Sequence, residues 1–195
     1  MNSNNQPQKN LPLLEAFEKF RELANALKAD TLIAYKELNQ TVIDNPFRPY
    51  RRRTFVRTSY AFIEGVCYGL RAICSVAKHM PDHCLTAEEL AYILETPKPD
   101  GKPNYLKGDV ILKESFKYAA KVLSLDFQLN CNHQGWTALK DSKEVRDNLA
   151  HPKNLVELDI SEADVSACHE GLKWFVMELT RFEKSPDISA SKGRS

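Results

Sequence analysis

Apolar residues along most of the chain recur at alternating spacings of three and four, a pattern typical of one face of an α-helix. The first such stripe covers residues 13–38 and the second covers residues 56–77. Pro46 and Pro81 follow the two stripes, and proline favours a helix end because it lacks an amide hydrogen and restricts the preceding residue. The pattern therefore predicts two long helices.

Two glycines, Gly65 and Gly69, lie one turn apart within the second stripe. A glycine inside a helix costs about 1 kcal/mol relative to alanine. We expect either that another helix comes unusually close at this face, or that bulky neighbouring side chains need the space.

The remainder of the chain also shows helical signals. Thr86-Ala-Glu-Glu89 is a capping-box pattern that opens a short helix through Leu94, and Ser161-Glu-Ala-Asp164 is another helix start. Further helices are predicted over residues 111–125, from Trp136 to about Leu149, and over 165–182, whereas the proline-rich residues 96–108 are predicted to form a loop.

No segment of strand length alternates between apolar and polar residues, so the predicted fold class is all-α. We expect an antiparallel helical bundle of four to five main helices with short extra helices. It should form one domain over residues 11–185, and the polar ends, 1–10 and 186–195, are expected to be disordered.

Composition indicates which binding partners and which cellular compartment to expect for this domain. The net charge of +1 does not indicate a nucleic-acid-binding protein, so any such role must come from a local cluster of positive charge. We find no run of about 20 apolar residues that would span a bilayer, and the start MNSNNQPQKN lacks the apolar core of a signal peptide. Five cysteines occur without CxxC spacing, and Cys67 and Cys74 fall in helical apolar pattern. A reducing cytoplasm, with no membrane association, is expected.

The stretch VRDNLAHP, Val145 to Pro152, carries the strongest candidate chemistry. Pro152 pushes His151 out of the helical region, so the helix should end near Leu149 or Ala150, and His151 could turn back towards Arg146. The segment is polar where a bundle helix would normally place apolar residues, which favours a functional role.

An arginine and a histidine together suit the cleavage of a phosphodiester without a metal. The guanidinium of Arg146 offers a rigid fork of donors that fits phosphate oxygens. The imidazole of His151 could deprotonate a ribose 2′-hydroxyl or protonate the leaving oxygen. Asp147 and Asn148 could orient the pair or bind the substrate. The alternative is that Arg146 and Asp147 are solvated charges and that His151 caps the helix C-terminus.

RDNLAH followed by proline resembles the Arg-x4–6-His motif of the HEPN superfamily, in which a polar residue commonly follows the arginine, as Asp147 does here. The motif lies before the final helix, as it does in that superfamily. SYAFIEGV, Ser59 to Val66, also resembles the helix that precedes the motif in several members.

The resemblance implies a compact helical bundle with metal-independent endoribonuclease activity and no cofactor. Two motifs would meet across a homodimer to cleave RNA, with Arg146 and His151 as the catalytic pair and Asp147 in support. Such proteins often act as toxins or in antiphage defence, so an antitoxin or a regulatory protein is a further expected partner. One branch of the superfamily has a tyrosine two residues after the histidine, where this chain has Lys153.

RPYRRRTFVR, residues 48–57, holds five arginines in ten positions at the start of the second predicted helix, interleaved with aromatic residues. Positive charge at a helix N-terminus opposes the helix dipole, so the cluster is not a device for helix stability. One interpretation is an RNA track that contacts phosphates, formed by Arg51, Arg52, Arg53 and Arg57. The other is that these arginines pair with carboxylates of the first helix.

The histidines and cysteines between residues 79 and 133 show no usual zinc spacing, and no GxxxxGK loop occurs. No metal site is therefore expected. Two alternatives to the nuclease stay open: a catalytically silent HEPN-like module that binds RNA or a protein, and a plain helical interaction protein in which VRDNLAHP is only a helix end.

Overall fold

The computed structural model describes residues 11–80, 84–97, 100–102 and 106–185. Within these ranges the chain forms α-helices, one short 3₁₀ turn and no strand, which confirms the all-α prediction. The two ends that the sequence predicts to be disordered, 1–10 and 186–195, lie outside the described residues.

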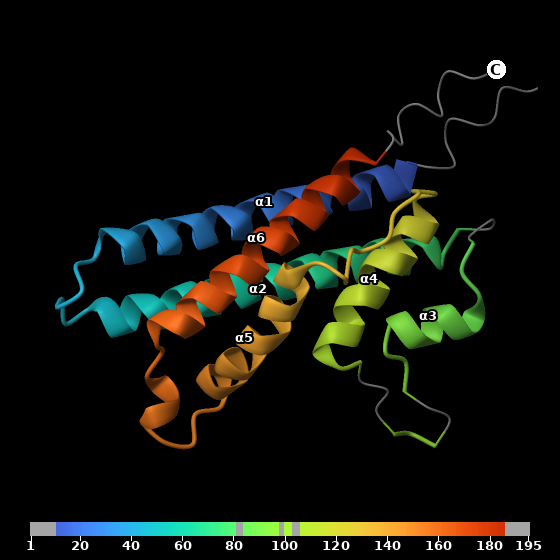
Figure 1. Cartoon of the computed structure of the whole chain (residues 1–195). Helices are drawn as coiled ribbons and strands as arrows, with labels where there is room; N and C mark the ends of the chain where they lie inside the picture. Colours follow the sequence, from blue (N-terminus) through green and yellow to red (C-terminus); the bar gives the residue numbers. More distant parts are fainter. Residues whose placement is uncertain (1–10, 81–83, 98–99, 103–105, 186–195) are drawn as a thin grey trace, which may run out of the picture. The chain divides into compact units, whose positions relative to one another are not determined.

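Figure 1 shows the order of the elements. They are α1 (Leu11–Gln40), α2 (Arg48–Ala77), α3 (Ala87–Ile93), α4 (Gly108–Val122), α5 (Gln134–Ala150), the 3₁₀ turn η1 (Val156–Leu158) and α6 (Glu162–Lys184).

The helix α2 begins at Arg48, eight residues before its apolar stripe begins at Val56, so the arginine cluster lies at the start of this helix, as the sequence predicts. Pro49 falls in the first turn, where a missing amide hydrogen breaks no helical hydrogen bond. The arginine cluster is therefore helical over its whole length.

The chain divides into two compact units. The first contains the described parts of residues 1–23, 66–129 and 181–195, and the second contains residues 24–65 and 130–180. The prediction of a single domain over residues 11–185 stays a prediction.

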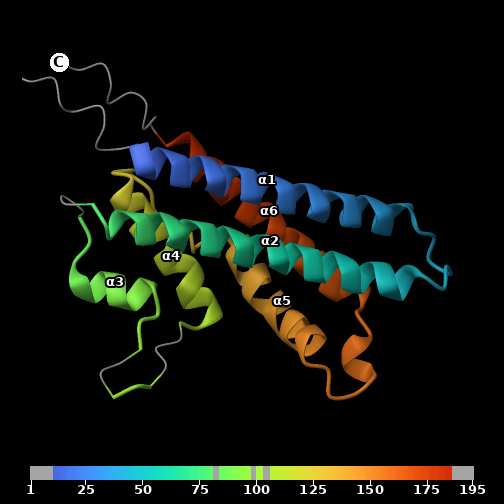
Figure 2. The same ribbon diagram turned by 180° about the vertical axis from the view of Figure 1, so that it is seen from behind.

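The first unit contains the end of α2 together with α3 and α4 (Figure 2). Its core includes Phe116, Phe127 and Phe182, whose ring centroids lie 5.2–5.7 Å apart. The predicted capping box at the start of α3 is present, since Thr86 and Glu89 exchange hydrogen bonds between side chain and backbone. At the other end of α3, Arg71 of α2 donates to the carbonyl of Ile93 at 2.8 Å.

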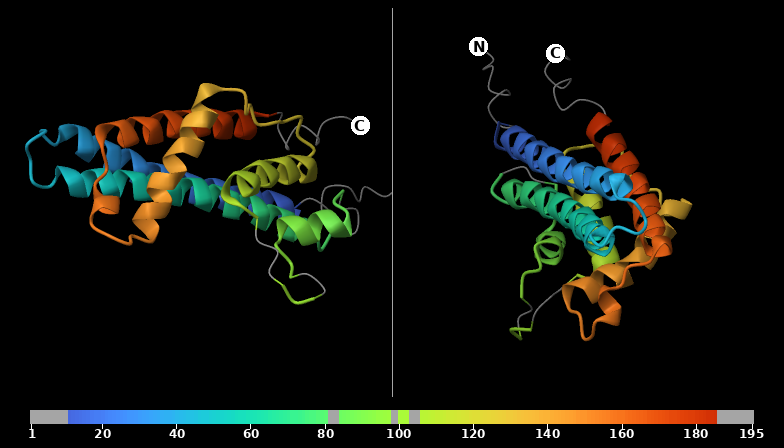
Figure 3. Two further views of the ribbon diagram at one scale, coloured as in Figure 1. Left: turned by 60° about the horizontal axis from the view of Figure 1, so that its bottom comes forward. Right: turned by 90° about the vertical axis from the view of Figure 1, so that its left-hand side faces the viewer.

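The second unit contains the end of α1, the beginning of α2, α5 and most of α6 (Figure 3). Thr31 of α1 is buried and donates to the carbonyl of Thr58 in α2 at 3.0 Å, which joins these two helices. Phe62 and Phe175 pack edge to face at 5.3 Å. The indole of Trp174 donates to the carbonyl of Asn130 at 3.1 Å, which fixes the approach to α5.

The glycines of α2 make room for side chains of α1. A Cβ atom on Gly65 would collide with Cδ1 of Leu27, and one on Gly69 would lie 2.8 Å from Cδ2 of Phe20. The interpretation that bulky neighbours need this space is confirmed. A close approach of backbones occurs instead at Gly171 of α6, where a Cβ atom would lie 2.7 Å from the Cα of Leu139 in α5.

Three cysteines, Cys67, Cys74 and Cys168, are buried. Burial raises the pKa of the Cys67 and Cys74 thiols to about 12 and that of Cys168 to about 11. These thiols stay protonated and pack as small hydrophobic groups, as the sequence predicts for Cys67 and Cys74.

By length and composition α2 could cross a membrane, since an 18-residue window within it reaches a mean hydropathy of 1.2. Glu64 and Arg71 interrupt the apolar residues of α2, so it still holds no unbroken run of about 20 of them. In addition, 56% of that window is buried inside the protein. Core helices of soluble proteins have the same property, so the window alone does not indicate a membrane span.

We predict that Gly171→Ala lowers the free energy of unfolding by roughly 1–3 kcal/mol, as overpacking does. In an ordinary helix the same change raises stability by about 1 kcal/mol. Here the new methyl group meets backbone atoms of Leu139, which can move only if α5 shifts. Urea unfolding of the wild type and the variant measures the difference.

Gly65→Ala is the matched control for this substitution. Its methyl group meets the end of the Leu27 side chain, which can rotate away, so the loss should be smaller than for Gly171→Ala. A Gly171→Ala protein as stable as the wild type would contradict the close contact between α5 and α6.

Candidate functional site

The motif segment lies at the end of α5 in the second unit. The helix ends at Ala150, and His151 leaves the helical region with φ −136° and ψ 59°. The amide of His151 still donates to the carbonyl of Asp147 at 3.1 Å. The predicted helix end before Pro152 is confirmed, and a local rule, the restriction that proline places on the preceding residue, accounts for it.

Arg146 is held against α2. Its guanidinium pairs with Glu64, and its Nη1 donates to Oδ1 of Asp147 at 2.7 Å. The guanidinium carbon also lies 5.8 Å from the centre of the Tyr60 ring, within the range of a cation–π contact. The Arg146 side chain remains 32% exposed, so it is oriented without being enclosed.

Tyr60 provides a rigid base for this arginine. Its buried hydroxyl donates to the carbonyl of Leu139 at 2.9 Å and bonds the hydroxyl of Ser142 at 2.8 Å. Burial raises the pKa of Tyr60, so the phenol stays protonated and keeps donating. These contacts fix α5 on α2 one to two turns before Arg146.

The sequence predictions did not include Tyr60 and Glu64 among the site residues. The two lie one helical turn apart, so their side chains share a face of α2. Both belong to the stretch Ser59 to Val66, whose resemblance to a helix of the HEPN superfamily was the one available signal. Only the packing of α5 on α2 shows that they face Arg146.

Asp147 links Arg146 to the preceding turn of α5, because Lys143 also donates to its carboxylate. Partial burial by itself would raise the pKa of Asp147, but the hydrogen bonds from Lys143 and Arg146 outweigh it and lower that pKa. Asp147 is therefore ionised at neutral pH, and it can orient a cation but cannot act as a general acid.

His151 is exposed, and its imidazole forms no hydrogen bond or ion pair with any described residue. The imidazole therefore neither caps the last carbonyls of α5 nor bonds to Arg146 within one chain. Asn148 is half-buried and likewise forms no side-chain hydrogen bond within the described ranges. Leu155 and Val156 follow the motif and are 84% and 80% exposed.

The predicted RNA track consists largely of arginines with partners inside the chain. Arg51 pairs with Glu37 of α1, which agrees with the alternative interpretation for this residue. The other three donate to backbone carbonyls: Arg52 to Ile160 at 2.8 Å, Arg53 to Leu158 at 3.2 Å and Arg57 to Leu149 at 3.4 Å. A bound phosphate would have to compete with these partners.

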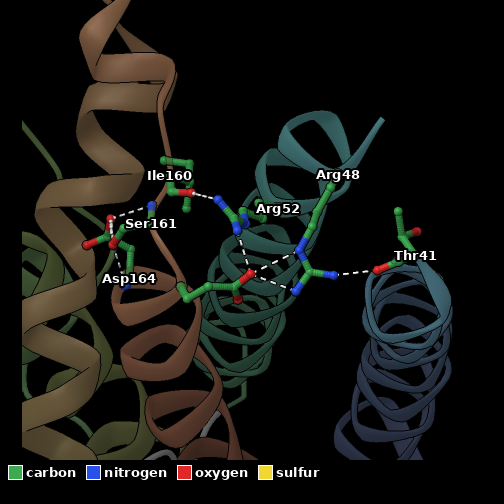
Figure 4. Close-up of polar contacts among 7 residues, drawn as sticks. Thr41, Arg48, Arg52, Ile160, Ser161 and Asp164 are labelled. Carbon is green, nitrogen blue, oxygen red and sulfur yellow. Dashed lines mark hydrogen bonds and ion pairs between the residues drawn. The ribbon is translucent and has the colours of Figure 1, made fainter. Parts of the chain in front are cut away.

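Glu162, at the start of α6, completes the arrangement around Arg48 and Arg52, which are labelled in Figure 4. One of its carboxylate oxygens accepts from Arg48 at 2.6 and 2.9 Å and from Arg52 at 2.5 Å. Hydrogen bonds from Arg48 and Arg52 lower the pKa of Glu162, so it stays ionised. The carboxylate that neutralises these two arginines thus comes from the last helix, not from the first.

No group of three or more metal-ligating side chains occurs among the residues that the structure describes. His83, one of the histidines considered for zinc, lies outside them.

We predict that Asp147 titrates below the ordinary aspartate value of about 3.9, and that Lys143→Ala raises its pKa by removing a hydrogen bond. A lowered pKa adds stability above about pH 4, and this stability is lost as the pH falls through the folded-state pKa. NMR titration of the Asp147 carboxyl carbon measures this pKa in the wild type and in Lys143→Ala. Lys140→Ala, one turn earlier, is the control and should leave the value unchanged. Titration of wild-type Asp147 at or above 3.9 would contradict the arrangement.

Comparisons with protein-family models, with curated proteins and with solved structures found no match for this chain. The similarity to the HEPN motif therefore rests on the residues quoted above.

Proposed function

We propose that the protein is a metal-independent endoribonuclease in which Arg146 and His151 act on the same phosphodiester. The observation that carries this proposal is the contrast between the two side chains. Arg146 is oriented by Glu64, Asp147 and Tyr60, whereas His151 is exposed and has no partner among the described residues.

The proposed role of Arg146 is to offset charge on the phosphoryl group. A guanidinium has five N–H donors in a fixed plane. Glu64 and Asp147 engage both terminal nitrogens of Arg146, but they leave other N–H groups of a partly exposed side chain open to phosphate oxygens. The two carboxylates also preserve the direction of the fork, which a free arginine would lose to rotation.

The proposed role of His151 is proton transfer. The imidazole accepts the proton of a ribose 2′-hydroxyl, whose oxygen then attacks the neighbouring phosphorus. The bond to the 5′-oxygen breaks, and this oxygen takes the proton that the imidazole accepted, which leaves a 2′,3′-cyclic phosphate, a 5′-hydroxyl and a neutral imidazole. Each of the two side chains would contribute on the order of 10²–10⁴ in rate.

The proposal includes a homodimer. Arg146 and His151 lie five residues apart, or about 7.5 Å along a helix axis, and they do not bond to each other within one chain. A second motif across an interface would supply the complementary pair, and the exposed Leu155 and Val156 give this surface apolar area to bury. A cytoplasmic toxin or defence setting, with RNA as substrate and an antitoxin or regulatory protein as partner, belongs to the same proposal.

The second candidate is a catalytically silent module that binds RNA or a protein. One observation favours it: a groove of about 390 Å³ lies between α1 and α6 in the second unit. Its lining is mostly apolar and includes Leu32, Leu172, Val176 and Met177, with Lys28 and Lys173 among the polar residues. Such a surface can hold a partner without any chemistry.

We predict that the purified protein cleaves single-stranded RNA in the presence of EDTA. His151→Ala and Arg146→Ala should each lower the rate by at least about 10². Circular dichroism should show that both variants stay helical, since neither side chain is buried. The products, resolved on a gel, should carry 2′,3′-cyclic phosphate ends.

His79→Ala is the control, because His79 is exposed and belongs to the first unit, whereas the motif belongs to the second. It should leave the rate unchanged. Loss of cleavage on chelation would exclude the mechanism. RNA binding without cleavage, unaffected by His151→Ala, would favour the silent module.

A further inference from the structure

A row of arginines on α2 contacts the backbone on both sides of the segment that carries His151. Arg57 reaches the carbonyl of Leu149, in the last turn of α5. Arg53 reaches the carbonyl of Leu158, at the end of η1, and Arg52 reaches that of Ile160. These acceptors lie before and after the exposed residues 151–156.

The segment between these acceptors has mainly local contacts of its own. The amide of Lys153 donates to Glu157 at 2.7 Å, and the amide of Glu157 donates to Asn154 at 3.1 Å. Ile160 is the first buried residue after Leu149. These hydrogen bonds are local to the loop, and η1 lies against α5. The hydrogen bonds that join the connection to α2 are at its two ends.

The downstream end is held most firmly. Arg52 uses Nη1 for the Ile160 carbonyl and Nη2 for Glu162, so one planar group bridges a loop carbonyl and the first residue of α6. Arg48, one turn earlier, binds the same carboxylate (Figure 4). Ser161 and Asp164 cap α6 at this point through reciprocal hydrogen bonds of 2.9 and 3.1 Å.

We infer that Arg52, Arg53 and Arg57 are positioning residues for His151 and not contacts for RNA. Arg52 and Arg53 fix the downstream end of the loop. Arg57, which is exposed, adds a longer contact of 3.4 Å at the end of α5, so that together the three set the place of the imidazole relative to Arg146. The link to catalysis rests on the proposed function, whereas the control of the loop does not.

The spacing and the chemistry of the arginines fit this role. Residues 53 and 57 lie one turn apart on α2, and so do residues 48 and 52, which gives two adjacent rows that point at the loop and at α6. Arg52 must reach two acceptors in different directions, which the arginine fork can do and the single ammonium of lysine cannot. Its side chain is only 17% exposed, so little of it faces a passing phosphate.

The decisive variant is therefore Arg52→Lys, tested beside Arg52→Ala. A phosphate contact depends mainly on charge, so an RNA track predicts that lysine replaces arginine well. A positioning bridge predicts that lysine behaves nearly as badly as alanine. Arg21→Ala is the control, since Arg21 is an exposed arginine of α1 whose partner among the described residues is Glu18.

Limited trypsin digestion gives a readout that needs no nuclease activity. Lys153 lies inside the loop, so its cleavage rate reports how often the loop opens. We expect cleavage after Lys153 to rise on the order of tenfold in Arg52→Lys and Arg52→Ala, as the loss of one or two charge-assisted hydrogen bonds would allow. Arg53→Ala loses a single, longer hydrogen bond, so its cleavage after Lys153 should rise less. This graded response would distinguish local opening of the loop from a general loss of folding.

Kinetics on RNA give the second readout. The positioning role predicts a kcat for Arg52→Lys at least about tenfold lower, with KM and the salt dependence of RNA binding unchanged. The inference would be overturned if trypsin cleaved Arg52→Ala after Lys153 at the wild-type rate, while this variant bound RNA more weakly and with a shallower salt dependence. If the wild-type protein cleaves no RNA, the proposed function fails, but faster cleavage at Lys153 in Arg52→Lys would still support arginine control of the loop.

Discussion

The buried hydroxyl of Tyr60 is the contact on which the site most depends. It donates to the carbonyl of Leu139 and bonds Ser142, while Gly171 of α6 lets the backbone of the same Leu139 approach from another direction. Within the second unit α5 is thus fixed at one point by α2 and α6 together. A small rotation of α5 would break a hydrogen bond on one side and create a backbone clash on the other. The direction of Arg146, two turns later, follows from this constraint.

Arginine side chains have two different environments in this protein, and the proposed function gives them two different uses. At Arg146 the guanidinium is paired with carboxylates but still reaches solvent, which suits the reversible binding of a phosphate. At Arg52 and Arg53 the guanidinium donates to carbonyls of the chain itself, which suits a permanent structural bond. A net charge of +1 is compatible with both uses, because the carboxylates Glu37, Glu64 and Glu162 neutralise arginines locally.

The connection from α5 to α6 combines an ordered frame with an exposed middle. Its ends are bonded to α2, and the residues between them carry His151, Leu155 and Val156 towards solvent. The proposed catalytic role of His151 requires an imidazole that is open to its substrate and yet held in place. Bonds to the flanking backbone meet both needs, since they leave the imidazole itself unengaged.

The sequence by itself determined the features that depend on neighbouring residues. Helical periodicity predicted the helices, the Thr86 and Ser161 caps marked two helix starts, and Pro152 marked the end of α5. These follow from local rules of backbone geometry and hydrogen bonding. The apolar stripe alone does not mark the start of α2, because Arg48 to Phe55 are helical but carry no clear stripe.

Only the tertiary structure decided what the arginines bind and which residues surround Arg146. Arg52 and Ile160 lie 108 positions apart, and Arg57 and Leu149 lie 92 apart. Their acceptors are backbone carbonyls, which every residue carries, so no pattern of side chains marks them. In the sequence, nothing distinguishes Glu64 from other glutamates. Its pairing with Arg146 depends on the packing of α5 beside α2. The partners depend on how helices distant in sequence meet, and that is set by packing and not by local sequence.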